Sequence, residues 1–503
     1  MNHAAAQKQV ERARQRLLGD DFAGALRAYE VLTRQFPASA VIWFEYGNAA
    51  SGLHRAALAA QAWRRAMDLD PSNHELIALI GHQYQGLRQP EAARECFARA
   101  AAAGPRAINP RISLAVLLEQ AHRVEEARKT VAECLAIAPG DDQARYFSAV
   151  LDRRENLVES AEARLRDLIA SGPRHPYVRY ACRYELAQVL DRTGRFDEAM
   201  AALTEAKQIV RGLTDVDALL RGYDEGARRA REFTRALPRD ILAQWGAGFP
   251  SAGREAAPAL AFLGGHPRSG TTLLEQVLDA HPAVAAVDES PAFIQVLEPA
   301  FHASRELTPA RLNTLRRLYL DALRAEAGPH AEGRLLVDKN PSPTSRMPVW
   351  LRVFPELRVV IALRDPRDVV LSCYFQNIAL NPVNANFLSL VRVARHYSDL
   401  MDIWLAAREW DGFAWCETRY EDLVADTVSE GRRVTEFLGL EWHAAQASFF
   451  EKSRGKQFYS PTYQDVTRPV YTRSVARWRH YEAHLAPVWP VLEPYCRRFG
   501  YPA

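Results

Sequence analysis

The sequence predicts a protein of two domains: an all-α helical solenoid built from repeats, followed by an α/β domain with a parallel sheet. Two observations support this prediction. In the first half, prolines recur at a constant interval of 34 residues. In the second half, short apolar runs alternate with amphipathic segments, as strands and helices do in parallel-sheet proteins. We expect the solenoid at 1–215, a helical linker at 216–257 and the α/β domain at 258–503.

Composition and charge exclude several classes of protein. The 503 residues are 48% hydrophobic and 25% charged, and 64 basic against 61 acidic residues leave a net charge of +3. That balance does not indicate a nucleic-acid or membrane partner. The six cysteines are scattered, the N-terminus is charged where a secretory signal is apolar, and no stretch approaches the ~20 apolar residues of a membrane span. We expect a cytoplasmic protein with free thiols.

The repeats have a recurrent internal pattern. Each proline follows a small residue by twelve positions and a bulky residue by eight. The prolines are Pro37, Pro71, Pro105, Pro139 and Pro173, the small residues are Ala25, Ala59, Ala93, Ala127 and Ala161, and the bulky residues are Tyr29, Trp63, Phe97, Val131 and Leu165. A small residue lets two helices approach, a large one fills the groove between them, and proline ends the second helix.

The pattern resembles the tetratricopeptide repeat, whose period is 34 residues. It covers roughly 5–210, and the last copy is slipped by four positions, because Ala199 lies 38 residues after Ala161. Such an array makes a concave surface suited to peptides, so we expect a protein or peptide to bind there. The alternatives are that the array only spaces, dimerises or covers the second domain, and homodimerisation stays open.

The second half contains five predicted strands with helices between them. The strands are LAFLGGH (260–266), AVAAVDE (283–289), RLLVDK (334–339), RVVIALR (358–364) and FAWCETRY (413–420). The helices are TTLLEQVLDAH, SRMPVWLRVF, PRDVVLSCYFQN and SLVRVARHYSDLMDIWLAAR. This order predicts a parallel sheet with helices on both faces, in which ligands bind beyond the carboxyl ends of the strands.

The first predicted strand continues into a glycine-rich turn, GGHPRSGTT. Backbone N–H groups of such a turn point inward at the positive end of a helix, so we expect it to bind an anion, with added donors from Ser269, Thr271 and Thr272. The spacing Gly265-x4-Gly270 is that of a P-loop. However, Thr271 stands where nucleoside triphosphatases have a lysine, which disfavours ATP hydrolysis. The plainer alternative is a tight turn without a ligand.

The fourth predicted strand ends in RDPRDVVLS. Arg364 leaves the carboxyl end of the strand, Pro366 suits the first turn of a helix, and Ser372 returns a hydroxyl from that helix. Guanidinium groups bind phosphate oxygens bidentately, so these residues predict a second phosphate clamp. The alternative is a helix-capping, surface-charge motif.

Together, PRSGTTLL and ALRDPRDVVLS resemble the paired loops of sulfotransferases that bind PAPS, 3′-phosphoadenosine 5′-phosphosulfate. The stretch 267–289 is similar to the tyrosylprotein sulfotransferases, and the whole resembles bacterial proteins that fuse tetratricopeptide repeats to a sulfotransferase domain. The resemblance covers about 260–480. It implies an all-α tetratricopeptide solenoid before an α/β, P-loop-like sulfotransferase domain, with PAPS as co-substrate. The sequence has no His or Cys cluster for a metal, and we expect none.

The resemblance implies a role for individual residues. The loop for the 5′-phosphosulfate matches Arg268, Ser269, Gly270, Thr271 and Thr272, and the 3′-phosphate pair matches Arg364 and Ser372. The remaining matches are Glu289 for the general base, Lys339 for a lysine that contacts the transferring group, Tyr420 for a tyrosine near the nucleotide and Arg477 for a basic residue that reaches the 3′-phosphate. Pro291 and Gln376 depart from the family pattern, which puts the acceptor side in more doubt than the donor side.

Single residues also have plainer interpretations. Asp288 is a rival for the base, and Glu289 would then be a helix-capping acid. Lys339 would be a solvated turn residue, and Tyr420 would pack in the core.

The sequence hypothesis is therefore a PAPS-dependent O-sulfotransferase that transfers a sulfuryl group in line to a hydroxyl. Lys339 and Arg268 would stabilise the leaving and sulfuryl oxygens while Glu289 accepts the proton. The acceptor would be a protein tyrosine, a glycan or lipid hydroxyl, or a small phenol. The alternatives are a P-loop kinase-like phosphotransferase and an inactive nucleotide-binding scaffold whose repeats bind proteins.

Overall fold

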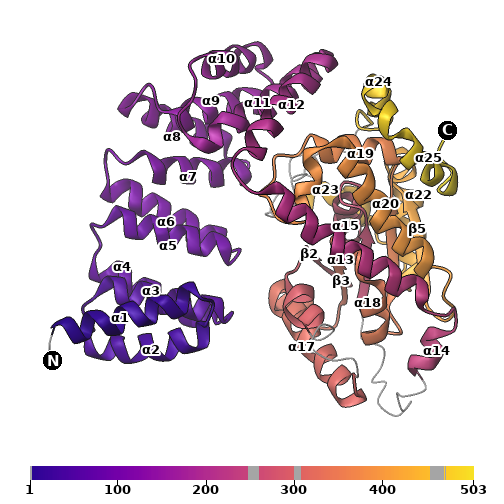
Figure 1. Cartoon of the computed structure of the whole chain (residues 1–503), viewed down its shortest axis with the longest axis horizontal. Coiled ribbons are helices and arrows are strands. Elements are labelled where there is room, and N and C mark those ends of the chain that lie inside the picture. Colours follow the sequence, from indigo (N-terminus) through magenta and orange to yellow (C-terminus); the bar gives the residue numbers. More distant parts are fainter. Residues whose placement is uncertain (1–2, 247–259, 300–306, 454–469, 471, 503) are drawn as a thin grey trace. The chain divides into compact units, whose positions relative to one another are not determined.

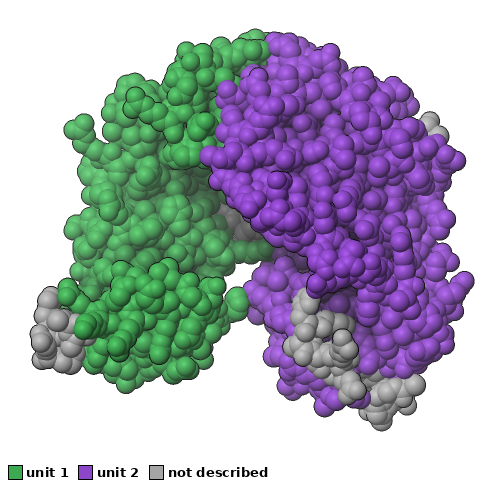
Figure 2. Space-filling model, in the orientation of Figure 1, with its two compact units in different colours: residues 1–182 green, residues 183–503 purple. Residues whose placement is uncertain are grey.

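The computed structural model describes residues 3–246, 260–299, 307–453, 470 and 472–502. The chain divides into two compact units, residues 1–182 and 183–503 (Figure 2). Two expected segments fall partly outside the described residues. They are the linker 216–257, from residue 247 on, and the last loop of the resemblance, VTRPVYTRSVARW, at 466–469 and 471.

The N-terminal part is a succession of helix pairs (Figure 1). The pairs are α1 (His3–Leu18) with α2 (Phe22–Gln35), α3 (Ala40–Gly52) with α4 (Ala56–Leu69), α5 (His74–Gly86) with α6 (Pro90–Ala103), α7 (Ile108–Gln120) with α8 (Val124–Ile137), α9 (Asp142–Arg154) with α10 (Val158–Ala170), and α11 (Pro176–Arg192) with α12 (Phe196–Arg211). The predicted prolines follow the second helix of the first five pairs.

The turn inside each pair contains one residue with a positive φ. These residues are Asp20, His54, Arg88, His122, Asn156 and Gly194. The first five recur every 34 residues, whereas Gly194 follows Asn156 by 38. The reason is the length of the preceding helix, because α11 has 17 residues and α9 has 13. The slip of four positions in the sequence is thus one extra turn at the end of α11.

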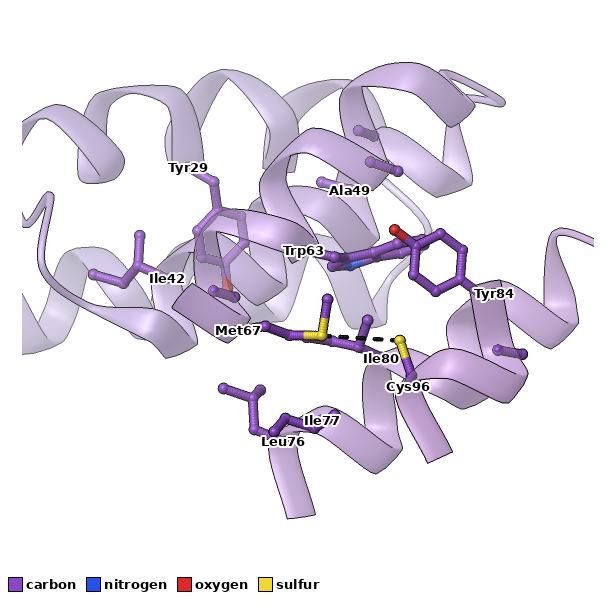
Figure 3. Close-up of a cluster of buried hydrophobic side chains, with 14 of the residues drawn as sticks. Tyr29, Ile42, Ala49, Trp63, Met67, Leu76, Ile77, Ile80, Tyr84 and Cys96 are labelled. Atoms are coloured by element: carbon purple, nitrogen blue, oxygen red, sulfur yellow. Dashed lines mark hydrogen bonds between the residues drawn. The ribbon is translucent and has the colours of Figure 1, made fainter. Parts of the chain in front are cut away.

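The alanine and bulky-residue pattern forms the core of the helix pairs. Ala25, Tyr29, Ala59 and Trp63 are fully buried. Trp63 meets Tyr84 of the next pair edge to face, with ring centroids 5.0 Å apart (Figure 3). In the second pair, the bulky residue needs a glycine opposite it in the first helix. A Cβ on Gly47 of α3 would lie only 2.4 Å from Trp63 Nε1. The predicted packing of small against large residues is confirmed.

The second unit contains a five-stranded, all-parallel sheet in the order β2-β3-β1-β4-β5. The strands are β1 (Leu260–Gly265), β2 (Val284–Asp288), β3 (Leu335–Lys339), β4 (Arg358–Leu363) and β5 (Ala414–Arg419). All five agree with the predicted runs. Because β1 lies between β3 and β4, the loops after these three strands open at the same edge.

Helices cover both faces of the sheet, as predicted. Ala261 and Leu263 pack with Leu274 of α15 (Thr271–Asp279) and Val434 of α22 (Thr427–Phe437). Phe262 points to the other face, where its ring lies 4.6 Å from that of Trp350 in α18 (Met347–Val353). The other long helices of this unit are α17 (Pro309–Ala327), α19 (Pro366–Tyr374), α20 (Leu390–Ala407) and α25 (Trp489–Arg498).

The predicted linker begins with a long helix, α13 (Val216–Ala236), followed by α14 (Ile241–Gly246). Helix α13 packs on α20 through charged and aromatic groups. Tyr223 donates to Asp399 Oδ2 at 3.2 Å, Arg231 forms an ion pair with the same carboxylate, and Arg235 Nη2 lies 2.7 Å from Asp402 Oδ2. Nowhere in the described ranges is a helix both long and apolar enough to span a bilayer.

Candidate functional site

The glycine-rich turn connects β1 to α15 and is closely packed around its two outer glycines. Gly265 has a φ of +128°, and a Cβ there would lie 2.3 Å from the carbonyl oxygen of Ala362 on β4. Gly270 has a φ of +90°, and its Cβ would lie 2.6 Å from the ring of Tyr420. Only glycine fits either position. The turn therefore has the form expected of an anion cradle at the start of a helix.

Polar side chains of this turn lie inside the protein. Ser269, Thr271 and Thr272 are each at most 5% exposed. Arg268, at the tip, has a left-handed φ of +74°. Non-glycine residues adopt this conformation at a cost, which is typical of functional sites where the surroundings fix the backbone.

The second predicted loop, after β4, meets the first directly. Arg268 Nε donates to Ser372 Oγ on α19 at 3.1 Å. In return, Arg364 Nη1 donates to the main-chain oxygen of Arg268 at 3.2 Å. The two anion-binding loops predicted from the sequence are thus joined by two hydrogen bonds, one in each direction.

Arg364 is buried, and its guanidinium lies over the ring of Tyr420, 4.7 Å from the centroid. Its Nη2 donates to the main-chain oxygen of Ser474 at 2.5 Å. Its Nε is buried and has no hydrogen-bond partner among the described residues. A buried guanidinium N–H that lacks an acceptor suits an anionic ligand. Tyr420, which the family resemblance matches to a tyrosine near the nucleotide, contacts both loops through Gly270 and Arg364.

Lys339 lies at the end of β3 in a cluster of carboxylates. The lysine is fully buried. Its Nζ contacts Asp288, lies 3.1 Å from Glu289 Oε1 and is 3.9 Å from Glu275 Oε2. Burial lowers the pKa of Lys339, but the charges of Asp288, Glu289 and Glu275 outweigh it and raise the pKa above its ordinary value. The lysine is therefore a permanent cation.

The two candidate bases differ in their surroundings. Asp288 ends β2 and pairs with Lys339 in the β2–β3 register, and its side chain is 12% exposed. Glu289 follows with a φ of +51°, its N–H donates to the Lys339 carbonyl at 2.8 Å, and its side chain is 38% exposed. The positive φ turns the Glu289 side chain out of the alternation of the strand, so its carboxylate is the more accessible of the two.

Arg477 is tied to a helix rather than to either loop. Its Nε donates to Asp191 Oδ1 of α11 at 3.0 Å, and its guanidinium lies over the ring of Phe375, 4.2 Å from the centroid. Phe375 follows Ser372 by three residues, at the end of α19. The structure thus places Arg477 beside the end of α19, the helix that carries Ser372.

Comparison with known proteins identifies both parts of the chain. Residues 259–444 match the sulfotransferase family, and residues 180–209 match the tetratricopeptide repeat. The chain carries a sulfotransferase domain behind tetratricopeptide repeats. The fold class and the family predicted from the sequence are confirmed.

Individual relatives are distant. An uncharacterized protein of Aquifex aeolicus (strain VF5) is 26% identical over 63% of this chain and 41% of its own length. Protein-tyrosine sulfotransferase A of Caenorhabditis elegans is 26% identical over 48% of this chain and 66% of its own length. The chain thus spans less than two thirds of either relative. Among solved structures, the sulfotransferase domain of the Synechococcus PCC 7002 olefin synthase is 21% identical, with a TM-score of 0.32 over 45% of this chain and 90% of that one.

Beneath the first loop of the sulfotransferase domain lies a histidine pair that the sequence reasoning missed. His266 and His396, on α20, are buried, and His266 Nε2 lies 2.7 Å from His396 Nδ1. His266 Nδ1 lies 2.7 Å from the Pro267 carbonyl, which can only accept, so this nitrogen carries the proton and Nε2 accepts from His396. Burial lowers the pKa of His266 to about 4, only partly offset by the Pro267 bond. The pair is neutral at physiological pH.

A second missed residue is Asp368, on α19. Its Oδ1 accepts the Trp478 N–H at 2.7 Å, so it fixes the segment that carries Arg477. Burial raises the pKa of Asp368 to about 6, while Arg364 opposes the shift. His266 lies in the first loop motif, GGHPRSGTT, and Asp368 lies in the second, RDPRDVVLS. Both could be recognised in the sequence as polar residues, but neither had an assigned role. His396 and Asp191 carry no local signal, since each comes close to the site only through the fold.

In the part of the chain that the structure covers, no group of three or more His, Cys, Asp or Glu side chains is placed to hold a metal ion.

Proposed function

We propose that the protein is a PAPS-dependent O-sulfotransferase. One observation carries the proposal: the reciprocal bonds between Arg268, Ser372 and Arg364, which join the two anion loops to each other. An adenosine that carries anionic groups on both the 5′ and the 3′ position of its ribose can contact both loops at once. A nucleoside triphosphate has no phosphate on the 3′ position of its ribose and would leave the second loop unused.

The residues present fit such a donor. The cradle at Gly265 and Gly270 has no room for a side chain, and the buried Nε of Arg364 lacks an acceptor within the described structure. The first loop, with Ser269, Thr271 and Thr272, would hold the 5′-phosphosulfate, and Arg364 with Ser372 would hold the 3′-phosphate. The donor supplies a sulfuryl group in a mixed anhydride with phosphate.

The chain's own residues would then neutralise charge and move one proton. As sulfur bonds to the acceptor oxygen, its bond to the bridging oxygen of the donor breaks, and negative charge grows on that oxygen. Arg268 and the permanently charged Lys339 would stabilise this charge. Glu289, the more accessible carboxylate beside Lys339, would take the hydroxyl proton of the acceptor. Asp288 would balance the charge of the buried lysine.

The acceptor class is also a proposal. Relatives of this domain are named protein-tyrosine sulfotransferases, and the tetratricopeptide repeats supply a surface of the kind that binds proteins. Both observations favour a hydroxyl on a protein or peptide over a glycan or a small phenol.

Calorimetric titration with adenosine 3′,5′-bisphosphate, AMP and ATP tests the donor assignment. We expect the bisphosphate to bind at least tenfold more tightly than AMP, since a charge-assisted contact contributes about 1.5–3 kcal/mol. Tighter binding of ATP would instead support a P-loop kinase-like phosphotransferase. Incubation with radiolabelled PAPS and a host-cell extract then identifies the acceptor. Nucleotide binding without any labelled product across fractionated extracts would support an inactive scaffold.

A further inference from the structure

The extra turn of α11 carries a residue that touches the sulfotransferase domain. Helix α11 begins in phase with the 34-residue period but runs for 17 residues instead of 13, so residues 189–192 have no counterpart in the earlier repeats. Asp191 lies in this turn. It belongs to the same compact unit as the sheet, residues 183–503.

Asp191 holds two residues of the C-terminal segment. Its Oδ1 accepts from Arg477 Nε at 3.0 Å and from the hydroxyl of Tyr481 at 2.6 Å. Arg477 Nη2 also lies 2.9 Å from the same oxygen, within ion-pair distance. The carboxylate thus fixes one edge of the guanidinium, the edge formed by Nε and Nη2.

The backbone on either side of Arg477 is fixed by the second anion loop. Arg364 donates to the Ser474 carbonyl at 2.5 Å, and Asp368 accepts the Trp478 N–H at 2.7 Å. Between these anchors, Ala476 has a positive φ of +56°. Such a strained residue persists only where its surroundings over-determine the backbone. The segment 474–478 is therefore shaped by Arg364 and Asp368 on one side and by Asp191 on the other.

The rest of the last repeat packs on the helix that carries Ser372. Lys207 of α12 is buried, donates to the Phe387 carbonyl at 2.8 Å, and lies 4.1 Å from the centre of the Tyr374 ring. Thr204 lies 3.4 Å from the Tyr374 hydroxyl. On the C-terminal side, Phe196 stacks on His480, with ring centroids 4.5 Å apart. These contacts make α11 and α12 a supporting wall for α19 and the segment after it.

We infer that Asp191 is a positioning residue for Arg477, and that the extra turn of the last repeat is thereby part of the donor-binding site. Held by Asp191 and stacked on Phe375, Arg477 is pre-organised beside Ser372 to contact the 3′-phosphate. This inference rests on the proposed function, since it assigns Arg477 to the ribose phosphate of the donor. It predicts that a residue of the repeat array sets the affinity for that phosphate.

The test measures the preference for adenosine 3′,5′-bisphosphate over AMP by calorimetry. Asp191→Asn should reduce this preference roughly five- to twentyfold, in the range of couplings between residues of one network, and leave AMP binding unchanged. When Asp191→Asn is introduced into the Arg477→Met variant, it should not reduce the preference for the bisphosphate any further. Tyr481→Phe removes the other partner of Asp191 and should leave the preference intact, as should Asp197→Asn, which breaks the neighbouring pair with His484 at 2.8 Å.

The outcomes separate the two proposals. If the wild-type protein shows no preference for the bisphosphate, the donor assignment itself fails. If the wild type has the preference and Asp191→Asn keeps it, or strengthens it, the positioning role is wrong. Equal losses in Tyr481→Phe and Asp191→Asn would also overturn it, because the carboxylate would then act only as a structural anchor. Should Asp191→Asn not fold, Asp191→Glu retains the charge, displaces the guanidinium and should lower the preference in the same assay.

Discussion

Arg268 donates from its Nε to the hydroxyl of Ser372, a residue 104 positions later in the chain, at 3.1 Å. Each belongs to a loop that the sequence marks as an anion site, and the bond makes them neighbours. The strands that precede the loops, β1 and β4, are adjacent in the sheet, and this adjacency brings the loops to one edge. Changes to residues of these loops and of the domain around them have measurable consequences.

Removing the second phosphate clamp should weaken binding of the 3′-phosphate alone. Arg364→Met is expected to reduce affinity for adenosine 3′,5′-bisphosphate by roughly 10- to 150-fold, the effect of losing hydrogen bonds to a charged group, with AMP affinity little changed. Arg358→Met, at the opposite end of the same strand, serves as the control. Equal loss of AMP affinity in Arg364→Met would contradict a specific contact to the 3′-phosphate.

Glu289→Gln should lower turnover by roughly 10²–10⁴-fold while adenosine 3′,5′-bisphosphate still binds, because a positioned base contributes about that much. Turnover is followed with radiolabelled PAPS and the acceptor found in the extract. Glu298→Gln removes a nearby carboxylate that pairs with Arg346 at 3.0 Å and should leave turnover unchanged. Asp288→Asn separates the rival bases. If it abolishes turnover and Glu289→Gln does not, Asp288 is the base.

Asp338 should make stability depend on pH. Burial raises the pKa of this residue, a neighbour of Tyr319 in the core, to about 7. The unfolded chain releases the proton near pH 4, so the folded state binds more protons between about pH 4 and 7. The stability gained from the protonated form is therefore lost as pH rises through this window and stays lost above it.

Asp338→Asn should flatten this dependence. In urea unfolding at several pH values, the free energy of unfolding of the variant relative to wild type should rise by a few kcal/mol between about pH 4 and 8, at about 1.4 kcal/mol per pKa unit. Asp321→Asn, on the exposed side of α17, is the control. A constant difference between Asp338→Asn and wild type across the whole range would contradict the raised pKa.

The histidine pair should support the first loop through its hydrogen bond. His396→Phe leaves His266 Nε2 buried without a donor, which costs about 1–3 kcal/mol, and should also weaken binding of adenosine 3′,5′-bisphosphate. His396→Asn offers an amide N–H in place of Nδ1–H and should restore part of the stability and part of the binding affinity. Chemical unfolding measures the stability, and calorimetry measures the affinity. If His396→Phe is as stable as wild type and binds adenosine 3′,5′-bisphosphate as tightly, the histidine pair does not support the first loop.

The repeats, the strands and the two loops could all be predicted from the sequence. Local patterns suffice for these, because a 34-residue period, five apolar runs and a glycine-rich turn each describe interactions close along the chain. The slip at Ala199 was visible in the sequence, but its meaning was not. Whether four extra residues lengthen a loop or a helix depends on packing, and here they extend α11.

The meeting of particular polar groups, in contrast, depends on the folded chain. The sequence left open that Lys339 is a solvated turn residue, yet the β2–β3 register buries it against Asp288 and Glu289. His396 reaches His266 across 130 residues, and Asp191 reaches Arg477 across 286. Such pairings arise from the order of strands and the length of one helix, quantities that no local pattern around either residue encodes.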